Sequence, residues 1–99
     1  MTALPDVQIL RIAETYKLLG DPTRLRILVA CLKGPIAVGD IATQTGASPS
    51  LVSHNLRLLR AARLVRSERR TRQVFYETAD DHIRHMLTDI IEHTDEAHD

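Results

Sequence analysis

Two helical patterns meet at a tight turn within residues 38–61, which read VGDIATQTGASPSLVSHNLRLLRA. The first helix covers 38–45, and Gly46 ends it. Ser48-Pro49 then supplies the N-cap and the first-turn proline of a second helix over about 49–61. Apolar residues with helical spacing are Val38, Ile41 and Ala42 in the first helix and Val52, Leu56 and Leu59 in the second. Two short helices joined in this way predict a helix-turn-helix.

Two further helices are predicted upstream of this unit. Residues 7–19 carry an apolar stripe that Gly20 ends. Asp21-Pro22 repeats the cap-plus-proline signal and begins a helix over about 22–33, which we expect to be the most buried because it is rich in apolar residues. Cys31 falls in this helix, and we expect a buried, inert thiol there.

A hairpin and a last helix are predicted downstream. The segments 64–68 and 73–77 favour strands, with Arg69 to Arg72 at the hairpin tip. The tip lacks the Gly or Asn of tight turns, so we expect a loop longer than two residues. Asp80 caps a final helix over about 81–95. The fold class is therefore mainly α with a small β-hairpin, a winged helix-turn-helix of five helices and a two-stranded wing.

Length and composition bound the possible functions. Ninety-nine residues suit a single domain spanning 1–99, and the near absence of aromatic residues requires an aliphatic core. No apolar run approaches the roughly 18 residues of a membrane span, and the N-terminus lacks the pattern of a secretory signal. Because a single cysteine cannot form an intramolecular disulfide, we expect a cytoplasmic protein without a membrane partner.

Charge is segregated along the chain although the formal net charge is zero. Residues 57–72 hold seven arginines and one acid, whereas residues 77–99 hold eight acids and one arginine. A basic middle and an acidic end indicate two partners, an anionic polymer and cations. The alternative is a set of intramolecular salt bridges or solvated faces.

The basic region coincides with the predicted reading elements of a DNA-binding domain. A second helix of a helix-turn-helix presents its N-terminal side chains to the major groove of double-stranded DNA, and an arginine-rich wing can contact the adjacent backbone. The expected DNA-binding residues are Ser48, Ser50, Ser53, His54 and Arg57 in the helix and Arg69, Arg70 and Arg72 in the hairpin. The alternative is a winged helix used only for protein contacts.

The last predicted helix carries two imidazoles and two carboxylates in the pattern D-x-H-x10-H-x2-E. These residues are Asp80, His82, His93 and Glu96. On one straight helix the two histidines lie about 16 Å apart, whereas a metal–nitrogen bond is about 2 Å. One ion therefore cannot contact both. Two antiparallel helices of a homodimer would pair the first two ligands of one chain with the last two of the other.

The donor set limits the choice of metal. Two nitrogen and two oxygen ligands suit tetrahedral Zn2+ or Co2+, and Zn2+ is the first choice. Ni2+ would require more ligands, which His85 or His98 could supply. A rival site within one chain would pair His85 with Asp89. The remaining alternative is an ordinary solvated face, although four of the five histidines lie after residue 81.

The chain resembles the ArsR/SmtB family of winged-helix repressors over about residues 10–96. The similarity is carried by LGDPTRLRIL at 19–28, SLVSHNL at 50–56, Leu64-Val65 and VFY at 74–76. The ligand pattern of the last helix matches the SmtB-like zinc-sensing branch at all four positions. The resemblance implies a homodimer with the first and last helices at its interface. It also implies an apo form that represses operator DNA and is released by metal.

Two positions depart from the family pattern. The family's thiol site is a Cys-x-Cys on the first helix of the helix-turn-helix, where this chain has Ala37-Val38-Gly39. Sensing of arsenite, cadmium or lead through those thiols is therefore excluded. Thr71 stands where the hairpin often has glycine, so the family gives no expectation for the conformation of the wing tip.

We therefore predict a metal-responsive transcriptional repressor. The alternative is a winged-helix repressor that is constitutive or responds to a different ligand. A metal-dependent hydrolase is disfavoured, because four side-chain ligands leave no open position for water. We expect no enzymatic activity.

Overall fold

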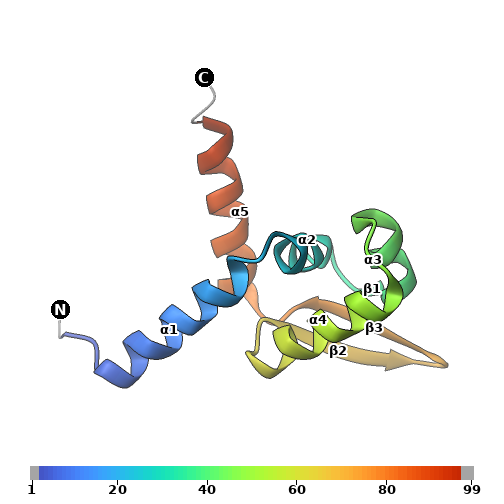
Figure 1. Cartoon of the computed structure of the whole chain (residues 1–99), viewed down its shortest axis with the longest axis horizontal. Helices are drawn as coiled ribbons and strands as arrows, with labels where there is room; N and C mark the ends of the chain where they lie inside the picture. The colour runs from blue at the N-terminus through green and yellow to red at the C-terminus, as the bar shows by residue number, and fades with distance from the viewer. Residues whose placement is uncertain (1–2, 97–99) are drawn as a thin grey trace.

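A computed structural model describes residues 3–96, and His98 lies outside the described residues. Figure 1 shows the mainly helical chain and its antiparallel sheet, which confirm a winged helix-turn-helix architecture. The elements are α1 (Asp6–Leu19), α2 (Pro22–Ala30), β1 (Ile36–Ala37), α3 (Val38–Thr45), α4 (Pro49–Ala61), β2 (Val65–Arg70), β3 (Gln73–Thr78) and α5 (Asp81–Glu96). The predicted bounds of α3 and α4 agree with the structure.

The sheet has one strand more than the predicted hairpin. Its order is β1-β3-β2, with both pairs antiparallel. The short strand β1 pairs Ile36 with Tyr76 at the edge of β3. Two residues are too few to show the alternating pattern that predicts a strand, so only the tertiary fold brings this segment to the sheet.

The wing tip differs from its prediction. Arg70 pairs with Gln73, so Thr71 and Arg72 alone form the loop, and the expectation of a longer loop is wrong. Thr71 adopts a φ of 58°, the positive value that a two-residue hairpin requires and that Gly or Asn usually supplies. The tight turn is therefore made by a residue type that is rare in this conformation.

The end of α4 explains why β2 begins one residue later than predicted. The backbone N–H of Leu64 donates to the carbonyl of Leu59 (2.9 Å), and that of Arg63 donates to the carbonyl of Arg60 (3.0 Å). Together with a φ of 61° at Arg63, this is a Schellman ending of the helix. Leu64 therefore belongs to the helix cap, and the strand starts at Val65.

The helix predicted over 22–33 is shorter and less buried than expected. α2 ends at Ala30, after which Cys31 caps it, and Gly34 turns the chain at a φ of 122°. α4 contributes four buried residues against two from α2. Composition overestimated α2 because its apolar run continues past the residue at which the backbone turns towards β1.

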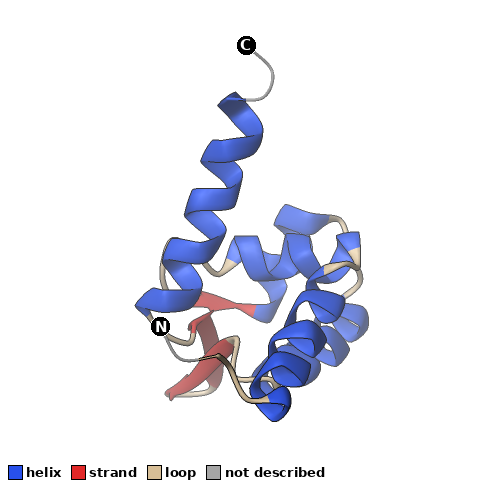
Figure 2. Cartoon of the chain, turned by 90° about the vertical axis from the view of Figure 1, so that its left-hand side faces the viewer, coloured by secondary structure: helices blue, strands red, loops and turns tan. Residues whose placement is uncertain are grey.

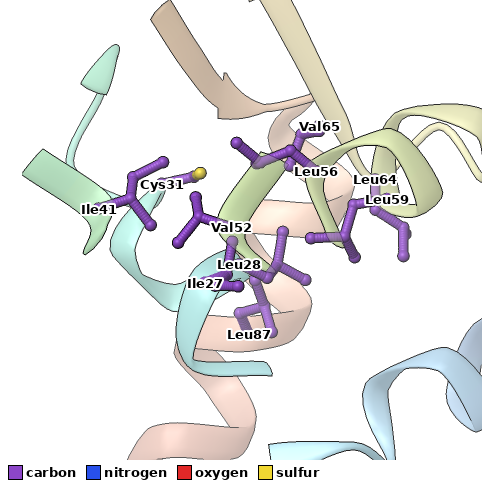
Figure 3. Close-up of a cluster of buried hydrophobic side chains, with 10 residues drawn as sticks. All are labelled: Ile27, Leu28, Cys31, Ile41, Val52, Leu56, Leu59, Leu64, Val65 and Leu87. Carbon is purple, nitrogen blue, oxygen red and sulfur yellow. The ribbon is translucent and has the colours of Figure 1, made fainter. Parts of the chain in front are cut away.

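One aliphatic cluster joins the helices to the sheet (Figure 3). Its buried members are Ile27, Leu28, Cys31, Ile41, Val52, Leu56, Leu59, Leu64, Val65 and Leu87. The three residues of α4 that were predicted to point inward are fully buried. The cluster holds one face of α4 against the body, so the opposite face is left to solvent.

The first and last helices are only partly joined to this core. Across Asp6–Leu19, all of which the structure describes, no side chain is buried. Along α5 the only buried side chain is that of Leu87, and Figure 2 shows the helix extending away from the body. Exposed large apolar residues are Val7, Ile9, Leu10, Ile12 and Tyr16 on α1 and Ile90 and Ile91 on α5. Among residues 3–96 no helix is long and apolar enough to cross a bilayer.

Candidate DNA-binding surface and metal ligands

The N-terminal turn of α4 is fixed by the cap that the sequence predicts. Ser48 Oγ accepts a hydrogen bond from the backbone N–H of Leu51 (3.1 Å), and Pro49 occupies the first helical position. Ser50, His54 and Arg57 are exposed on this helix, and Ser53 is half-buried. Short polar groups on the free face of a helix that begins with open N–H groups can reach base edges and phosphates in a major groove.

The arginines of the wing are not equivalent. Arg66 forms a salt bridge with Glu77 across the hairpin. Arg70 donates to Glu68 Oε2 (3.0 Å), and its guanidinium carbon lies 5.3 Å from the centroid of the Phe75 ring. These two arginines are held and partly neutralised by neighbours on one face of the hairpin.

Arg69 and Arg72 differ from that pair. Both are exposed, and neither forms a salt bridge within residues 3–96. Their charges are therefore available to phosphates, whereas that of Arg70 is shared with a carboxylate. All three were predicted as DNA contacts from arginine content alone, and the contact of Arg70 with Glu68 on the same strand now distinguishes it from the other two.

One polar residue of α4 that the sequence analysis did not single out is buried. Asn55 is 3% exposed and lies on the face that also carries Val52 and Leu59. Its Oδ1 accepts a hydrogen bond from Arg24 Nε (3.0 Å). A polar side chain within an otherwise apolar stripe was the available signal.

The predicted metal ligands lie at the two ends of α5. Asp80 Oδ1 accepts a hydrogen bond from the backbone N–H of Ile83 (3.0 Å), which confirms the predicted cap. Asp80, His82, His93 and Glu96 are all exposed. Within residues 3–96 of one chain, no three His, Cys, Asp or Glu side chains lie close enough together to hold an ion. One described chain therefore supplies only separated parts of a metal site.

Asp81, beside the first ligand, has its own partner. Arg84 donates a hydrogen bond to Asp81 Oδ1 (2.6 Å). That hydrogen bond and the charge of Arg84 lower the pKa of Asp81. The Asp81 carboxylate is therefore paired with a residue of its own helix.

Cys31 is buried as predicted. Its exposed fraction is zero, and burial together with the nearby charge of Glu77 raises the pKa of the thiol to about 12. Because the thiolate is the form that binds metals and attacks electrophiles, the native thiol is inert.

Known proteins match both the sequence and the fold. The family described as bacterial regulatory protein, arsR family, matches residues 21–67. A transcriptional repressor SmtB homolog of Synechocystis sp. is 38% identical over 88% of this chain and 66% of the relative's length. The cadmium metal-sensor CMTR of Mycobacterium tuberculosis is 40% identical over 80% of this chain and 82% of that chain, with a TM-score of 0.70. The chain belongs to the ArsR family.

The overall structure supports the same assignment. The homodimeric winged helix-turn-helix domain of Mb0332 from Mycobacterium bovis has a TM-score of 0.85 and 28% identity, covering 98% of this chain and 93% of that one. This ArsR-family chain is therefore a winged helix-turn-helix transcriptional regulator. The predicted fold class and the predicted role as a transcriptional regulator are confirmed.

Proposed function

We propose that this ArsR-family chain acts as a homodimeric repressor that a divalent metal ion releases from operator DNA. The observation that carries the proposal is the layout of α5. Its ligands stand exposed at both ends of a helix whose apolar side is incompletely covered. Two of the solved structures that this chain matches support this function: one is a homodimer and another is a cadmium sensor.

The dimer is inferred from the surfaces of α1 and α5. Val7, Leu10 and Tyr16 on α1 are each more than half exposed, and so is Ile90 on α5. Exposed large apolar side chains gathered on two helices favour these helices as an association surface. A two-fold axis makes the same patch meet itself, so the α5 helices of the two protomers can run antiparallel.

The antiparallel arrangement creates two equivalent metal sites. Each would combine Asp80 and His82 of one protomer with the partner subunit's His93 and the partner subunit's Glu96. Two imidazoles and two carboxylates fit tetrahedral Zn2+ or Co2+. The cap hydrogen bond fixes the orientation of the Asp80 carboxylate and leaves its second oxygen for the ion. Ni2+ would require a further donor such as His85, which is exposed on the same helix.

DNA is bound by the free face of α4 and by the wing. In α4 the reading residues are Ser48, Ser50, Ser53, His54 and Arg57. In the wing Arg69 and Arg72 neutralise phosphates, while Arg70 shapes the tip through Glu68 and Phe75. Because chromosomal DNA is the partner, we place the protein in the cytoplasm.

Bound metal lowers DNA affinity because it favours a dimer geometry in which the two α4 helices fit poorly into successive major grooves of the operator. A ligand shifts such an equilibrium only by its differential affinity for the two states. The coupling is reciprocal, so operator DNA must weaken metal binding by the same factor.

Titration with Co2+ and with Zn2+ tests the site. We expect one ion per chain and the absorption of a tetrahedral Co2+ complex, both lost in His93→Ala. The matched control is His85→Ala, which removes a histidine from the same helix but not from the pattern and should keep tetrahedral Co2+. Loss of the spectrum in the control with retention in His93→Ala would contradict the ligand set.

Operator binding with zinc and with chelator tests the response. We expect the affinity of the wild-type chain to fall by about 5- to 150-fold with zinc, the usual range for coupled sites. Equal affinity under both conditions would show a repressor that is constitutive or that responds to another ligand.

A further inference from the structure

We propose that Arg24 is a positioning residue that joins the dimerisation helix α1 to the reading helix α4 and thereby links dimer geometry to DNA affinity. This inference rests on the proposed function. We call the contact of Arg24 with Asn55 and with the carbonyl of Leu18 the Arg24 bridge.

The bridge spans three helices through a single guanidinium. Arg24 Nε donates to Asn55 Oδ1 (3.0 Å), and Arg24 Nη1 donates to the backbone carbonyl of Leu18 (3.0 Å). Both bonds are partly buried. Arg24 belongs to α2, Asn55 to α4 and Leu18 to α1, so one planar group with fixed donors sets the spacing of the other two helices.

The backbone of Arg24 is itself anchored. Its N–H donates to Asp21 Oδ2 (2.8 Å), the N-cap of α2, and Pro22 restricts the same turn. The Arg24 side chain therefore extends from a fixed backbone position. This lowers the conformational entropy that is lost when the guanidinium binds both acceptors.

The amide of Asn55 is held on both sides. Its Oδ1 accepts from Arg24, and its Nδ2 donates to the carbonyl of Leu51 one turn earlier in α4 (3.0 Å). Among residues 3–96, no buried side-chain polar atom lacks a partner. If the guanidinium moved away, Asn55 Oδ1 would be left buried and unpaired, which is unfavourable. The position of α4 is thereby tied to that of Arg24.

The connection to α1 is made in its last turn, the end of the helix at which Leu18 and Leu19 pack against the core. α1 has no buried side chain along its length. The carbonyl of Leu18 lies in its last turn, where helical carbonyls lack an intrahelical donor and a positive charge is favourable. A change in dimer geometry that tilts α1 moves this carbonyl, and the shared guanidinium passes the displacement to the buried face of α4.

The test compares Arg24→Lys with Arg26→Lys in the full chain. Lysine keeps the charge of Arg24 but not the planar fork that reaches two acceptors. Arg26 lies on the same helix, is exposed and has no side-chain hydrogen bond or salt bridge within the described residues 3–96. The readout is the ratio of operator affinities without and with zinc, together with metal stoichiometry and the free energy of unfolding.

We expect Arg24→Lys to lower that ratio towards 1, by roughly 2- to 30-fold according to the wild-type value, the range for residues that modulate coupling without touching either ligand. Metal stoichiometry should be unchanged, and Arg26→Lys should behave as wild type. A purely structural role would lower stability and leave the ratio of the folded protein intact, and that result would overturn the proposal. So would an equal effect of Arg26→Lys.

A second variant keeps the proposal falsifiable if Arg24→Lys folds poorly. Asn55→Leu replaces the buried amide by an apolar group of similar size and should lower the ratio in the same way. Both variants break the same contact, the hydrogen bond between Arg24 and Asn55. The double variant should therefore be no worse than the more affected single variant. Additive effects would contradict the bridge. If wild type itself shows no zinc effect on operator binding, the proposed function fails rather than the bridge alone.

Discussion

At the tip of the wing, Thr71 holds a backbone conformation that its side chain disfavours. A β-branched residue at a φ of 58° is unusual, and such strain costs about 1–2 kcal/mol. Glycine removes the strain but loses about 0.4–1 kcal/mol through the freer unfolded chain. Thr71→Gly should therefore raise the free energy of unfolding by up to about 1 kcal/mol, measured by chemical denaturation.

Its matched control is the other residue of the same loop. Arg72 does not have a positive φ, so Arg72→Gly pays only the entropic cost and should be neutral or destabilising. A destabilised Thr71→Gly beside an unaffected Arg72→Gly would contradict the strain.

Cys31 gives the free energy of unfolding a defined alkaline pH dependence. The pKa of its thiol is about 12 in the folded state against an ordinary value of 9.0. Above pH 9 the unfolded chain releases this proton while the native chain retains it. The contribution of Cys31 to stability is therefore complete below pH 9 and is lost as the pH rises towards 12, by at most about 1.4 kcal/mol per pH unit.

Denaturation of wild type and of Cys31→Ala between pH 8 and pH 11 measures this difference. The variant should show the shallower decline, because the other titrating groups are common to both proteins. Identical slopes would mean that the native thiol ionises normally.

The residues that sequence reasoning placed best are those governed by local rules. Ser48 and Asp80 cap their helices as predicted, because a cap depends on the next three residues alone. The distinction between Arg70 and Arg72 was not predicted, because it depends on where the loop begins. The two-residue loop keeps Arg70 in β2, where it bonds Glu68 on the same strand, and leaves Arg72 outside the strands. That loop length goes with the uncommon φ at Thr71.

At the level of single elements, the wing should contribute to DNA binding through the positive charges of its arginines. Arg69 and Arg72 are available to phosphates, whereas Arg66 is paired with Glu77. Alanine at Arg69 or Arg72 should weaken operator binding across sequences and reduce the slope of log affinity against log salt by about 1 each. Operator titrations at several salt concentrations measure both quantities.

Arg66→Ala is the control within the same hairpin. Its charge is already shared with a carboxylate, so it should change the salt slope least. A larger loss from Arg66→Ala than from Arg72→Ala would contradict the assignment of the wing.

The element that sequence reasoning misjudged most was α2. Its predicted span ran to residue 33 because apolar residues continue past Ala30, but the chain turns at Cys31 to deliver β1 to the sheet. Apolar content reports burial, not the backbone conformation that achieves it. The Arg24 bridge was missed for a related reason, because its acceptor Asn55 is 31 residues away in sequence.

For the whole molecule, the exposed side of α1 should control assembly. Leu10 is 63% exposed in the single chain, so Leu10→Glu should leave the protomer folded and convert the dimer to monomer. Operator affinity should fall with it, because two half-sites are no longer read together. Sedimentation equilibrium and circular dichroism check the two parts of this prediction.

Val29→Glu is the matched control, since Val29 is also an exposed apolar residue but lies on α2. It should remain dimeric. Monomers from both variants would place the interface elsewhere.

The antiparallel pairing that completes the metal sites remains a prediction from spacing. The sequence supplies the donor types and their separation along α5. The second chain that would bring His93 beside Asp80 is a matter of quaternary geometry, which patterns within one chain do not encode.

The bare surface of α1 has a consequence for regulation in the cell. A protomer leaves its apolar first helix in water, and pairing of protomers obeys mass action. Where the total concentration lies well below the dissociation constant of the dimer, most chains are single protomers and the concentration of dimers scales with the square of the amount synthesised. Halving the gene dosage would leave about one quarter of the dimers. Repression of the promoter would therefore fall more steeply than the amount of protein.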